Sequence, residues 1–438
     1  MVPLAEPKFR LEDFLFEDEN PNSIFERLFS ADALCACYAD HFTLSRAKGI
    51  DRFNGASFKK IATESLEASS KKCISGKFKF SPYLQHLRSK GAGKKPREIS
   101  IATVRDRVVL FQMKELLYSL FGNLRGNDLA NTKVHKLGKL LSGLDRSKIE
   151  VLRTDIEDFF PSVRHDVVLE RIKEVSKSTR ITSLFRKALE NQDYPTGRRA
   201  NRLPKRAQGV PQGLSISSAM ANLHLSEIDE KLNKKFGARY FRYVDDILIV
   251  CNQGEGKNVF TYLKRMFSKN GLRLHKLGNE KSDVFQLSSG FIYLGYKFSG
   301  VDNLGLTVRQ SSIDNLMENL VGLFTDFIRN KKKDFSRKPK FRNDQLYKSV
   351  FIEKLNERIT GAFSENRRFG WMFFFSEITD LQLLHKVDFV VATQFSRLPE
   401  FGGTPPPTIK TFMRTYFEVR HSKDRSYFVD YDSVSVRR

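Results

Sequence analysis

The stretch Ala238-Arg-Tyr-Phe-Arg-Tyr-Val-Asp-Asp-Ile-Leu-Ile-Val-Cys251 decides the fold of this chain. Two runs typical of β-strands, Ala238–Tyr243 and Ile247–Cys251, flank Val244-Asp245-Asp246, which predicts a β-hairpin with an acidic tip. Adjacent carboxylates repel each other, and a divalent cation that neutralises them stabilises such a pair. Most Asp-Asp pairs at turns are only solvated loops, so the assignment depends on what the rest of the chain supplies.

A further carboxylate ends a second apolar strand, Ile149-Glu-Val-Leu-Arg-Thr-Asp155. If the strands are neighbours, Asp155, Asp245 and Asp246 come together at their ends. Magnesium prefers carboxylate and phosphate oxygens, and two ions about 4 Å apart serve in-line phosphoryl transfer. The sequence therefore predicts a site for two Mg²⁺ ions, with Mn²⁺ as the alternative. One ion would activate a 3′-hydroxyl and the other would bridge a triphosphate.

The charge balance points to a polyanionic partner. The 438 residues include 75 Lys and Arg against 51 Asp and Glu, a net charge of +24, which is typical of nucleic-acid-binding proteins. No apolar run approaches about 18 residues, and the start lacks the pattern of an export signal, so we expect no membrane attachment. The four cysteines include no CxxC pair, which disfavours a zinc knuckle or a disulfide framework and favours a cytoplasmic protein.

The order of the predicted elements favours an α+β fold. Residues 1–75 are expected to be mainly helical, residues 76–101 extended, and residues 104–120 one helix, whereas residues 121–149 are polar and basic. After Asp155 we expect two helices, the acidic hairpin, a helix over residues 257–270 and an aromatic hairpin over residues 289–299. From about residue 311 the pattern is helical to the end, interrupted by the basic stretch 331–342. Strand, helix, helix, two strands and helix is the order of a ferredoxin-like palm.

The acidic hairpin is one of six motifs that together resemble reverse transcriptases. In chain order the motifs are Lys95-Pro-Arg-Glu-Ile-Ser-Ile-Ala-Thr-Val-Arg-Asp-Arg107, Thr154-Asp-Ile-Glu-Asp-Phe-Phe-Pro-Ser-Val163, Gln208-Gly-Val-Pro-Gln-Gly-Leu-Ser-Ile-Ser-Ser218 with Ala221-Asn-Leu223, Tyr243-Val-Asp-Asp246, Asn270-Gly-Leu-Arg-Leu274 with Asn279-Glu-Lys281, and Phe291-Ile-Tyr-Leu-Gly-Tyr296. In the same order, they are similar to the finger motif of retron and group II intron enzymes, motif A, motif B, the YxDD box, motif D and motif E.

The resemblance covers about residues 77–300 and implies a right-hand polymerase. We expect an N-terminal helical extension over residues 1–75, fingers over residues 76–150, a ferredoxin-like palm with an antiparallel sheet over residues 151–300, and a helical thumb or C-terminal region over residues 301–438. Motif B ends in Ser217-Ser218 where many relatives have Ser-Pro, so the turn there is expected to be looser.

The resemblance also implies roles for single residues. Asp155, Asp245 and Asp246 with the backbone carbonyl of Ile156 would hold the metals, Asp246 less directly. Phe160 matches an aromatic gate that excludes a ribose 2′-hydroxyl, and it is preferred over its neighbour Phe159. The remaining assignments are the nucleotide pocket at Gln212, Gly213 and Tyr243, triphosphate binding by Arg97 and Lys95, and proton donation to the pyrophosphate by Lys281.

Two further segments bear on the lineage. Asn131-Thr-Lys-Val-His135 and Ile359-Thr-Gly361 partly match the NAxxH and VTG elements of retron enzymes. Arg367-Arg-Phe-Gly-Trp-Met-Phe-Phe-Phe-Ser-Glu-Ile-Thr-Asp380 resembles the C-terminal region of stand-alone, defence-associated bacterial reverse transcriptases. That resemblance implies antiviral immunity with a dedicated noncoding RNA.

Two basic clusters are candidates for RNA binding, since Lys and Arg neutralise phosphates and interleaved aromatic rings stack on bases. They are Lys331, Lys332, Lys333, Arg337, Lys338, Lys340 and Arg342, and the group before motif B that contains Arg198, Arg199, Arg202, Lys205 and Arg206. A solvated loop is an equally good interpretation of the first cluster.

The leading hypothesis is an RNA-directed DNA polymerase that copies a noncoding RNA in phage defence. Its partners would be that RNA, the DNA product and dNTPs, with a homo-oligomer or a second defence protein left open. Untemplated or protein-primed DNA synthesis is one alternative. An RNA-binding maturase or scaffold with vestigial motifs is another, although such a scaffold needs neither Asp155, Asp245 and Asp246 nor Gln212.

Overall fold

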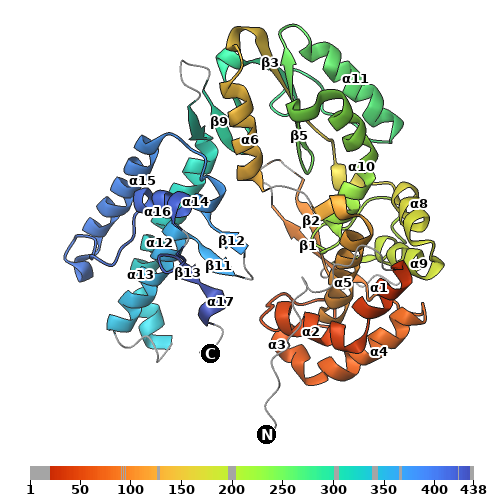
Figure 1. Ribbon diagram of the computed structural model, residues 1–438. Helices are drawn as coiled ribbons and strands as arrows, with labels where there is room; N and C mark the ends of the chain where they lie inside the picture. Colours follow the sequence, from red (N-terminus) through yellow and green to blue (C-terminus); the bar gives the residue numbers. More distant parts are fainter. Residues whose placement is uncertain are drawn as a thin grey trace. The chain divides into compact units, whose positions relative to one another are not determined.

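The computed structural model describes residues 20–434 except residues 90, 92, 94, 126–128, 196–203, 300–304, 338–343, 365–366 and 423. The chain forms two compact units, each built from segments that are distant in sequence (Figure 1). Unit 1 comprises Met1–Asn127, Asp155–Gly237 and Thr261–Lys276, and unit 2 comprises Asp128–Thr154, Ala238–Phe260 and Leu277–Arg438. Helices and strands occur in both units, so the predicted α+β class is confirmed.

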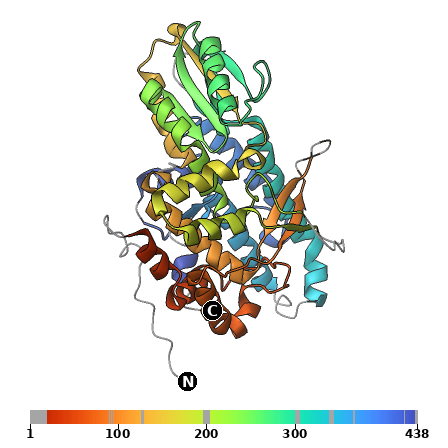
Figure 2. The ribbon, with the colours of Figure 1, turned by 90° about the vertical axis from the view of Figure 1, so that its right-hand side faces the viewer.

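Unit 1 begins with a helical cluster around one long helix, α5 (Val104–Leu120). The earlier helices α1, α2 and α4 pack on α5, and Figure 1 and Figure 2 both show this cluster in red to orange. Its core is apolar, with Phe25, Phe29 and Leu66 fully buried. The bounds of the helices before α5 are α1 (Pro21–Leu28), α2 (Ala31–His41), α3 (Gly55–Phe58) and α4 (Ala62–Ile74).

The rest of unit 1 combines a small sheet with a second set of helices. Strand β1 (Tyr83–Arg88) pairs antiparallel with β2 (Arg97–Ile101) and parallel with β4 (Asp193–Pro195). The helices here are α7 (Phe159–Ser162), α8 (His165–Ser176), α9 (Thr179–Leu189) and α10 (Ser217–Phe236), and α11 (Gly256–Lys269) ends in this unit.

Unit 2 contains a sheet of four strands in the order β5-β6-β3-β7. The strands are β3 (Ile149–Asp155), β5 (Tyr240–Tyr243), β6 (Asp246–Asn252) and β7 (Asp283–Gln286). β5 and β6 form an antiparallel hairpin in which Tyr243 faces Asp246, and β7 runs antiparallel to β3. Buried Val151, Phe241 and Leu248 of this sheet share one core with Val134 and Leu137 of α6 (Ala130–Ser142).

The remainder of unit 2 is helical with short strands. Its elements are β8 (Phe291–Tyr293), β9 (Tyr296–Phe298), β10 (Leu306–Val308), α12 (Gln310–Arg337), α13 (Asp344–Thr360), β11 (Ala362–Ser364), β12 (Arg367–Phe369), α14 (Trp371–Phe374), α15 (Leu381–Gln394), α16 (Phe412–His421), β13 (Val429–Asp430) and α17 (Tyr431–Val434). Many of the chain's phenylalanines pack here, with Phe324, Phe351 and Phe395 in edge-to-face contact. No helix in the part of the chain that the structure describes could span a membrane.

Several sequence predictions are confirmed and three are wrong. The helix over residues 104–120, the strand that ends at Asp155 and the two hairpins form as expected. Residues 121–149 are not merely polar, because α6 presents buried apolar side chains at helical spacing. The region after residue 311 is not helical throughout, since β11, β12 and β13 form a sheet. The basic stretch does not interrupt the helix at Lys331, because α12 continues to Arg337.

Candidate active site

The tip of the β5–β6 hairpin is held in an unusual backbone conformation. Val244 has φ +58°, in the left-handed region that β-branched residues rarely adopt. The guanidinium of the buried Arg242 donates a hydrogen bond of 2.8 Å to the Val244 carbonyl oxygen. The contact closes the turn, so that Asp245 and Asp246 are presented between two paired strands rather than on a solvated loop.

Arg153 of β3 makes a two-point ion pair with Asp246. Its Nε and one terminal nitrogen each lie 3.1 Å from a different carboxylate oxygen of Asp246. The side chains are only 19% and 16% exposed, so the pair is largely shielded from water. Tyr293 lies in the same electrostatic neighbourhood, and burial raises the pKa of its phenol well above the ordinary value. The Arg153 guanidinium thus binds both carboxylate oxygens of Asp246.

Asp155, the last residue of β3, begins a segment of unit 1 that pairs with residues 273–275. Ile156 forms an isolated antiparallel bridge with Leu274, and the backbone N–H of His275 donates to the Asp155 carbonyl oxygen at 3.1 Å. The His275 ring lies between two acids, with Nε2 3.6 Å from Asp155 Oδ2 and Nδ1 3.7 Å from Glu157 Oε1. This bridge fixes the backbone on both sides of the buried Ile156.

The predicted metal ligands suit a hard cation by chemistry, because carboxylate and carbonyl oxygens are the donors that Mg²⁺ prefers. Asp246 is the exception in this structure, since Arg153 already neutralises it. Within the described ranges, no three His, Cys, Asp or Glu side chains are close enough together to hold a metal ion. The two-metal assignment to Asp155, Ile156, Asp245 and Asp246 stays a prediction.

The turn after β3 separates the two adjacent phenylalanines. Asp158 has φ +43° and starts the short helix α7, in which Phe159 is buried in the core while Phe160 is half-buried. The Phe160 carbonyl oxygen accepts a hydrogen bond of 2.8 Å from the N–H of Val210, which connects motif A to motif B. Because Phe159 is used in packing, the exposure of the two rings favours Phe160 as the gate.

The motif B loop is bonded to the strand that carries Arg97. The N–H of Ser100 donates to the Gln212 carbonyl oxygen at 2.7 Å, and a parallel bridge joins Ile99 and Gln212. Gly213 has φ +100°, and a Cβ there would approach Ile99 Cγ2 to 2.8 Å, so no larger residue fits without rearrangement. The structure thus brings Gln212 and Gly213 together with β2, whose first residue is the exposed Arg97; Lys95 is also exposed.

The turn before α10 ends in Ser217-Ser218, where many relatives have Ser-Pro. Ser217 is the first residue of the helix, and its hydroxyl donates to the carbonyl oxygen of Pro211. This bond closes the turn before the helix without a proline. The looser turn expected from Ser217-Ser218, in comparison with relatives that have Ser-Pro, stays a prediction.

The remaining predicted site residues are Tyr243, Lys281 and the two basic clusters. Tyr243 is half-buried at the end of β5, and Lys281 is exposed in a turn where its N–H donates to Asn279 Oδ1 at 2.9 Å. Lys331, Lys332, Lys333 and Arg337 belong to the last turns of α12. Arg198, Arg199, Lys338, Lys340 and Arg342 lie outside the described residues.

Sequence reasoning missed Arg153, Arg242 and His275. Arg153 was detectable, because it is two residues before Asp155 on a strand and therefore points to the same face. Arg242 precedes the hairpin tip by two residues and follows the same alternation. His275 carried no such signal, since its partners are more than 100 residues away in the chain.

Comparison with known proteins identifies the domain. Residues 89–298 match the family model described as reverse transcriptase (RNA-dependent DNA polymerase). Protein YkfC of Escherichia coli K12 is 23% identical over 292 residues, which is 57% of this chain and 75% of that protein. An uncharacterized 91 kDa protein in a cob intron of Schizosaccharomyces pombe is 30% identical over 165 residues, 36% of this chain but only 19% of that protein.

Solved structures include a distant neighbour, apo telomerase from Candida tropicalis, with 14% identity and a TM-score of 0.42 over 90% of this chain and 76% of that one. The family match covers the palm motifs in full, and the predicted right-hand polymerase fold is confirmed. The chain carries a reverse transcriptase domain at residues 89–298 and is an RNA-directed DNA polymerase.

Proposed function

We propose that this polymerase copies a dedicated noncoding RNA into DNA in antiviral defence. One observation carries the proposal beyond the enzyme class: the two segments that resemble retron and defence-associated enzymes contact each other within unit 2. Asn131 of α6 donates from Nδ2 to the Phe373 carbonyl oxygen and to Ser376 Oγ, both at 3.2 Å. His135 of the same helix lies 2.8 Å from Glu377 through its Nδ1.

The contact is polar and directional, because the Asn131 amide and the His135 imidazole of α6 bind the backbone and side chains of Phe373–Glu377. The segment is further anchored by Tyr296 of β9, whose hydroxyl donates to the Phe374 carbonyl oxygen. This contact between the element before motif A and the C-terminal region supports an enzyme of the defence-associated kind, because it joins the two segments that resemble such enzymes. It gives no support to a scaffold whose polymerase motifs are vestigial.

The chemistry follows from the residues at the candidate active site. Asp155, Asp245 and the Ile156 carbonyl would hold two Mg²⁺ ions, which supply charge neutralisation for phosphoryl transfer when bound. Arg97 and Lys95 bind the triphosphate of the incoming nucleotide, Gln212 and Tyr243 line its pocket, and the Phe160 ring excludes the 2′-hydroxyl. Lys281 protonates the pyrophosphate as it leaves. Asp246, which forms an ion pair with Arg153, would bind the metals less directly than Asp155 and Asp245.

The partners would be the noncoding RNA, its DNA product and dNTPs, in the cytoplasm. The net charge of +24 supports binding to a polyanion. Basic side chains of α12 and of the segment before motif B would contribute phosphate contacts.

The proposal is tested by purifying the protein from cells and sequencing the RNA and DNA that accompany it. A single RNA species with complementary DNA is the expected result, together with dNTP incorporation in a primer-extension assay. The Asp245→Ala/Asp246→Ala variant should retain the RNA but lack the DNA, and cells that carry it should lose protection against phage. DNA without a complementary RNA would favour untemplated synthesis, and unchanged protection by the variant would favour a scaffold; either result contradicts the proposal.

A further inference from the structure

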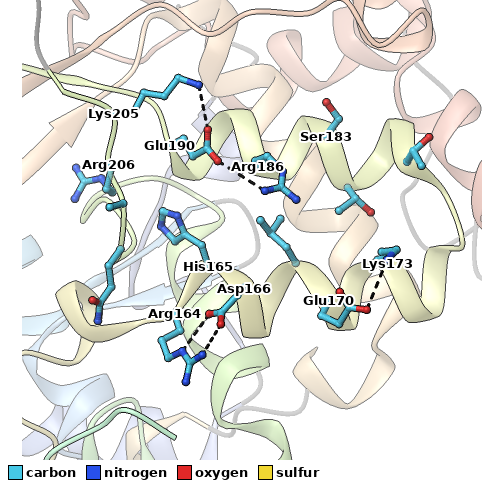
Figure 3. Close-up of a pocket in the computed structure, with 15 residues that line it drawn as sticks. Arg164, His165, Asp166, Glu170, Lys173, Ser183, Arg186, Glu190, Lys205 and Arg206 are labelled. Carbon is cyan, nitrogen blue, oxygen red and sulfur yellow. Dashed lines mark hydrogen bonds and ion pairs between the residues drawn. The ribbon is translucent and has the colours of Figure 1, made fainter.

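A groove in unit 1 lies between the antiparallel helices α8 and α9, apart from the predicted metal and nucleotide residues. It has a volume of about 880 Å³, and residues 205–208 form its third wall. Figure 3 shows Arg164 and Lys205 toward one end and Lys173 toward the other. From His165 to Lys173 the helix rises about 12 Å, which matches about three to four stacked nucleotides of a single strand.

The lining is rich in groups that bind phosphate. Its basic side chains are Arg164, Lys173, Arg186, Lys205 and Arg206, against three carboxylates. Thr179, Thr182 and Ser183 add hydroxyl groups at the N-terminal turn of α9, where the helix dipole favours an anion. Leu169 and Ala207 are the apolar side chains among these lining residues, which disfavours an apolar protein partner.

The carboxylates of the groove do not prevent phosphate binding, because their ion pairs are exposed. Lys173 pairs with Glu170 at 3.7 Å, and Lys205 pairs with Glu190 at 3.3 Å, with each lysine more than half exposed. Such solvent-exposed pairs contribute little to stability, so a phosphate can replace the carboxylate at small cost. A phosphodiester backbone presents several phosphates to these cations at once, which an isolated anion does not.

The floor of the groove is joined to the motif B loop. His165 lies with Nε2 2.7 Å from the Gly209 carbonyl oxygen, and Gln208 Nε2 donates to the Ser162 carbonyl oxygen at 3.1 Å. The N–H groups of Gly209 and Val210 donate to the carbonyl oxygens of Val163 and Phe160, each at 2.8 Å, so backbone hydrogen bonds hold the loop against the segment that follows β3. An RNA strand bound in the groove would thus lie at a fixed position relative to the segment that carries Phe160.

We propose that the α8–α9 groove is an RNA-binding site that holds the phosphodiester backbone of about three to four nucleotides outside the active site. The inference rests on the proposed function in that the bound RNA is the template molecule or a part of it. An acidic polypeptide would be attracted by the same cations, but it lacks the closely spaced phosphates that Arg164, Lys173, Arg186 and Lys205 can engage along the groove. The fifth cation, Arg206, is held by an ion pair with Asp193 and shapes the wall of the groove.

The test measures binding of a fluorescent oligouridine RNA of about 16 nucleotides to the full chain at several salt concentrations. The groove variant is Lys173→Gln/Lys205→Gln, which removes one exposed cation from each end. The control variant is Lys71→Gln/Lys148→Gln, which removes two exposed lysines elsewhere. Loss of two phosphate contacts should reduce the salt slope by about 1.4 and weaken binding about 25-fold at 0.1 M salt, while the control stays near wild type.

Equal binding by the groove and control variants would overturn the inference. It would also be overturned if a polyglutamate peptide bound the wild-type chain more tightly than RNA and lost that binding in the groove variant. Primer extension by the wild-type chain is measured separately. A chain that fails to extend primers but binds RNA through the groove would refute the proposed function alone, and the reverse result would refute the groove alone.

Discussion

Replacing Arg153 by Met should destabilise unit 2 far more than removing an ordinary surface cation. The substitution preserves the length and apolar stem of the side chain but removes both hydrogen bonds to Asp246. It leaves a carboxylate that is only 16% exposed without its bound cation. The unpaired charge, not the lost packing, is the expected source of the effect.

The magnitude follows from the exposure of the pair. Breaking a fully buried ion pair from one side costs about 3–5 kcal/mol, whereas exposed pairs contribute about 0–1 kcal/mol. Because about a fifth of each side chain still reaches water, we expect the lower end of the first range, about 3 kcal/mol. For a domain of this size class that loss lowers the midpoint of thermal unfolding by about 6–12 °C.

The assay is thermal unfolding followed by circular dichroism, with Lys148→Met as the matched control. Lys148 belongs to the same unit and pairs with Asp145 at 3.1 Å, but its side chain is 77% exposed, so its loss should shift the midpoint by about 4 °C or less. A double-variant cycle with Asp246→Asn should give a coupling of at least about 1 kcal/mol. Equal shifts for Arg153→Met and Lys148→Met, or a coupling near zero, would refute the reasoning from burial.

Three more predictions concern catalysis, substrate choice and pH. Asp245→Ala should lower the primer-extension rate more than about 100-fold, and Asp246→Asn should lower it less, since Arg153 already binds that carboxylate; the reverse order would contradict the assignment of Asp245. Phe160→Ala should reduce the preference for dNTPs over NTPs at least about 10-fold, whereas Phe159→Leu, in the core, should lower stability without changing the preference. Burial lowers the pKa of His224 to about 4, so the unfolded chain binds the extra proton between about pH 6.5 and 4 and stability falls as the pH falls through that window. His224→Leu should therefore be more stable than wild type at pH 5, by about 2 kcal/mol, with a smaller difference at pH 8; an equal difference at both values would exclude the titration of His224.

Local patterns predicted the elements whose signals lie within one segment. The apolar runs that precede Asp155 and flank Asp245 predicted β3, β5 and β6, because the residues of one strand suffice to show such a run. The helix α6 was missed although Val134, Leu137 and Leu141 have helical spacing, since polar residues dominate its neighbours. The strand β13 is two residues long and pairs with β11 across more than 60 residues of chain, so no local pattern could show it.

The candidate site shows the same division. Gln212 and Gly213 were identified from their motif, but only the folded chain reveals that Gln212 is bonded to the backbone of Ser100. The pairing of Asp246 with Arg153 also depends on two strands becoming neighbours. The motifs therefore predict which residues form the site, whereas long-range pairing of strands determines that Arg153 binds Asp246.

The sheet order β5-β6-β3-β7 has a consequence for how the chain is made. The strand β3 leaves the ribosome first, and its neighbour β6 follows about 90 residues later, which takes about 5–20 s at ordinary rates of translation. During that interval β3 has no neighbouring strand, and its apolar side chains Ile149, Val151 and Leu152 are not yet buried by the rest of the sheet. An unpaired apolar strand is a site of aggregation, so slower elongation before β6 should lower the yield of native protein, and chaperones that bind nascent chains should restore it.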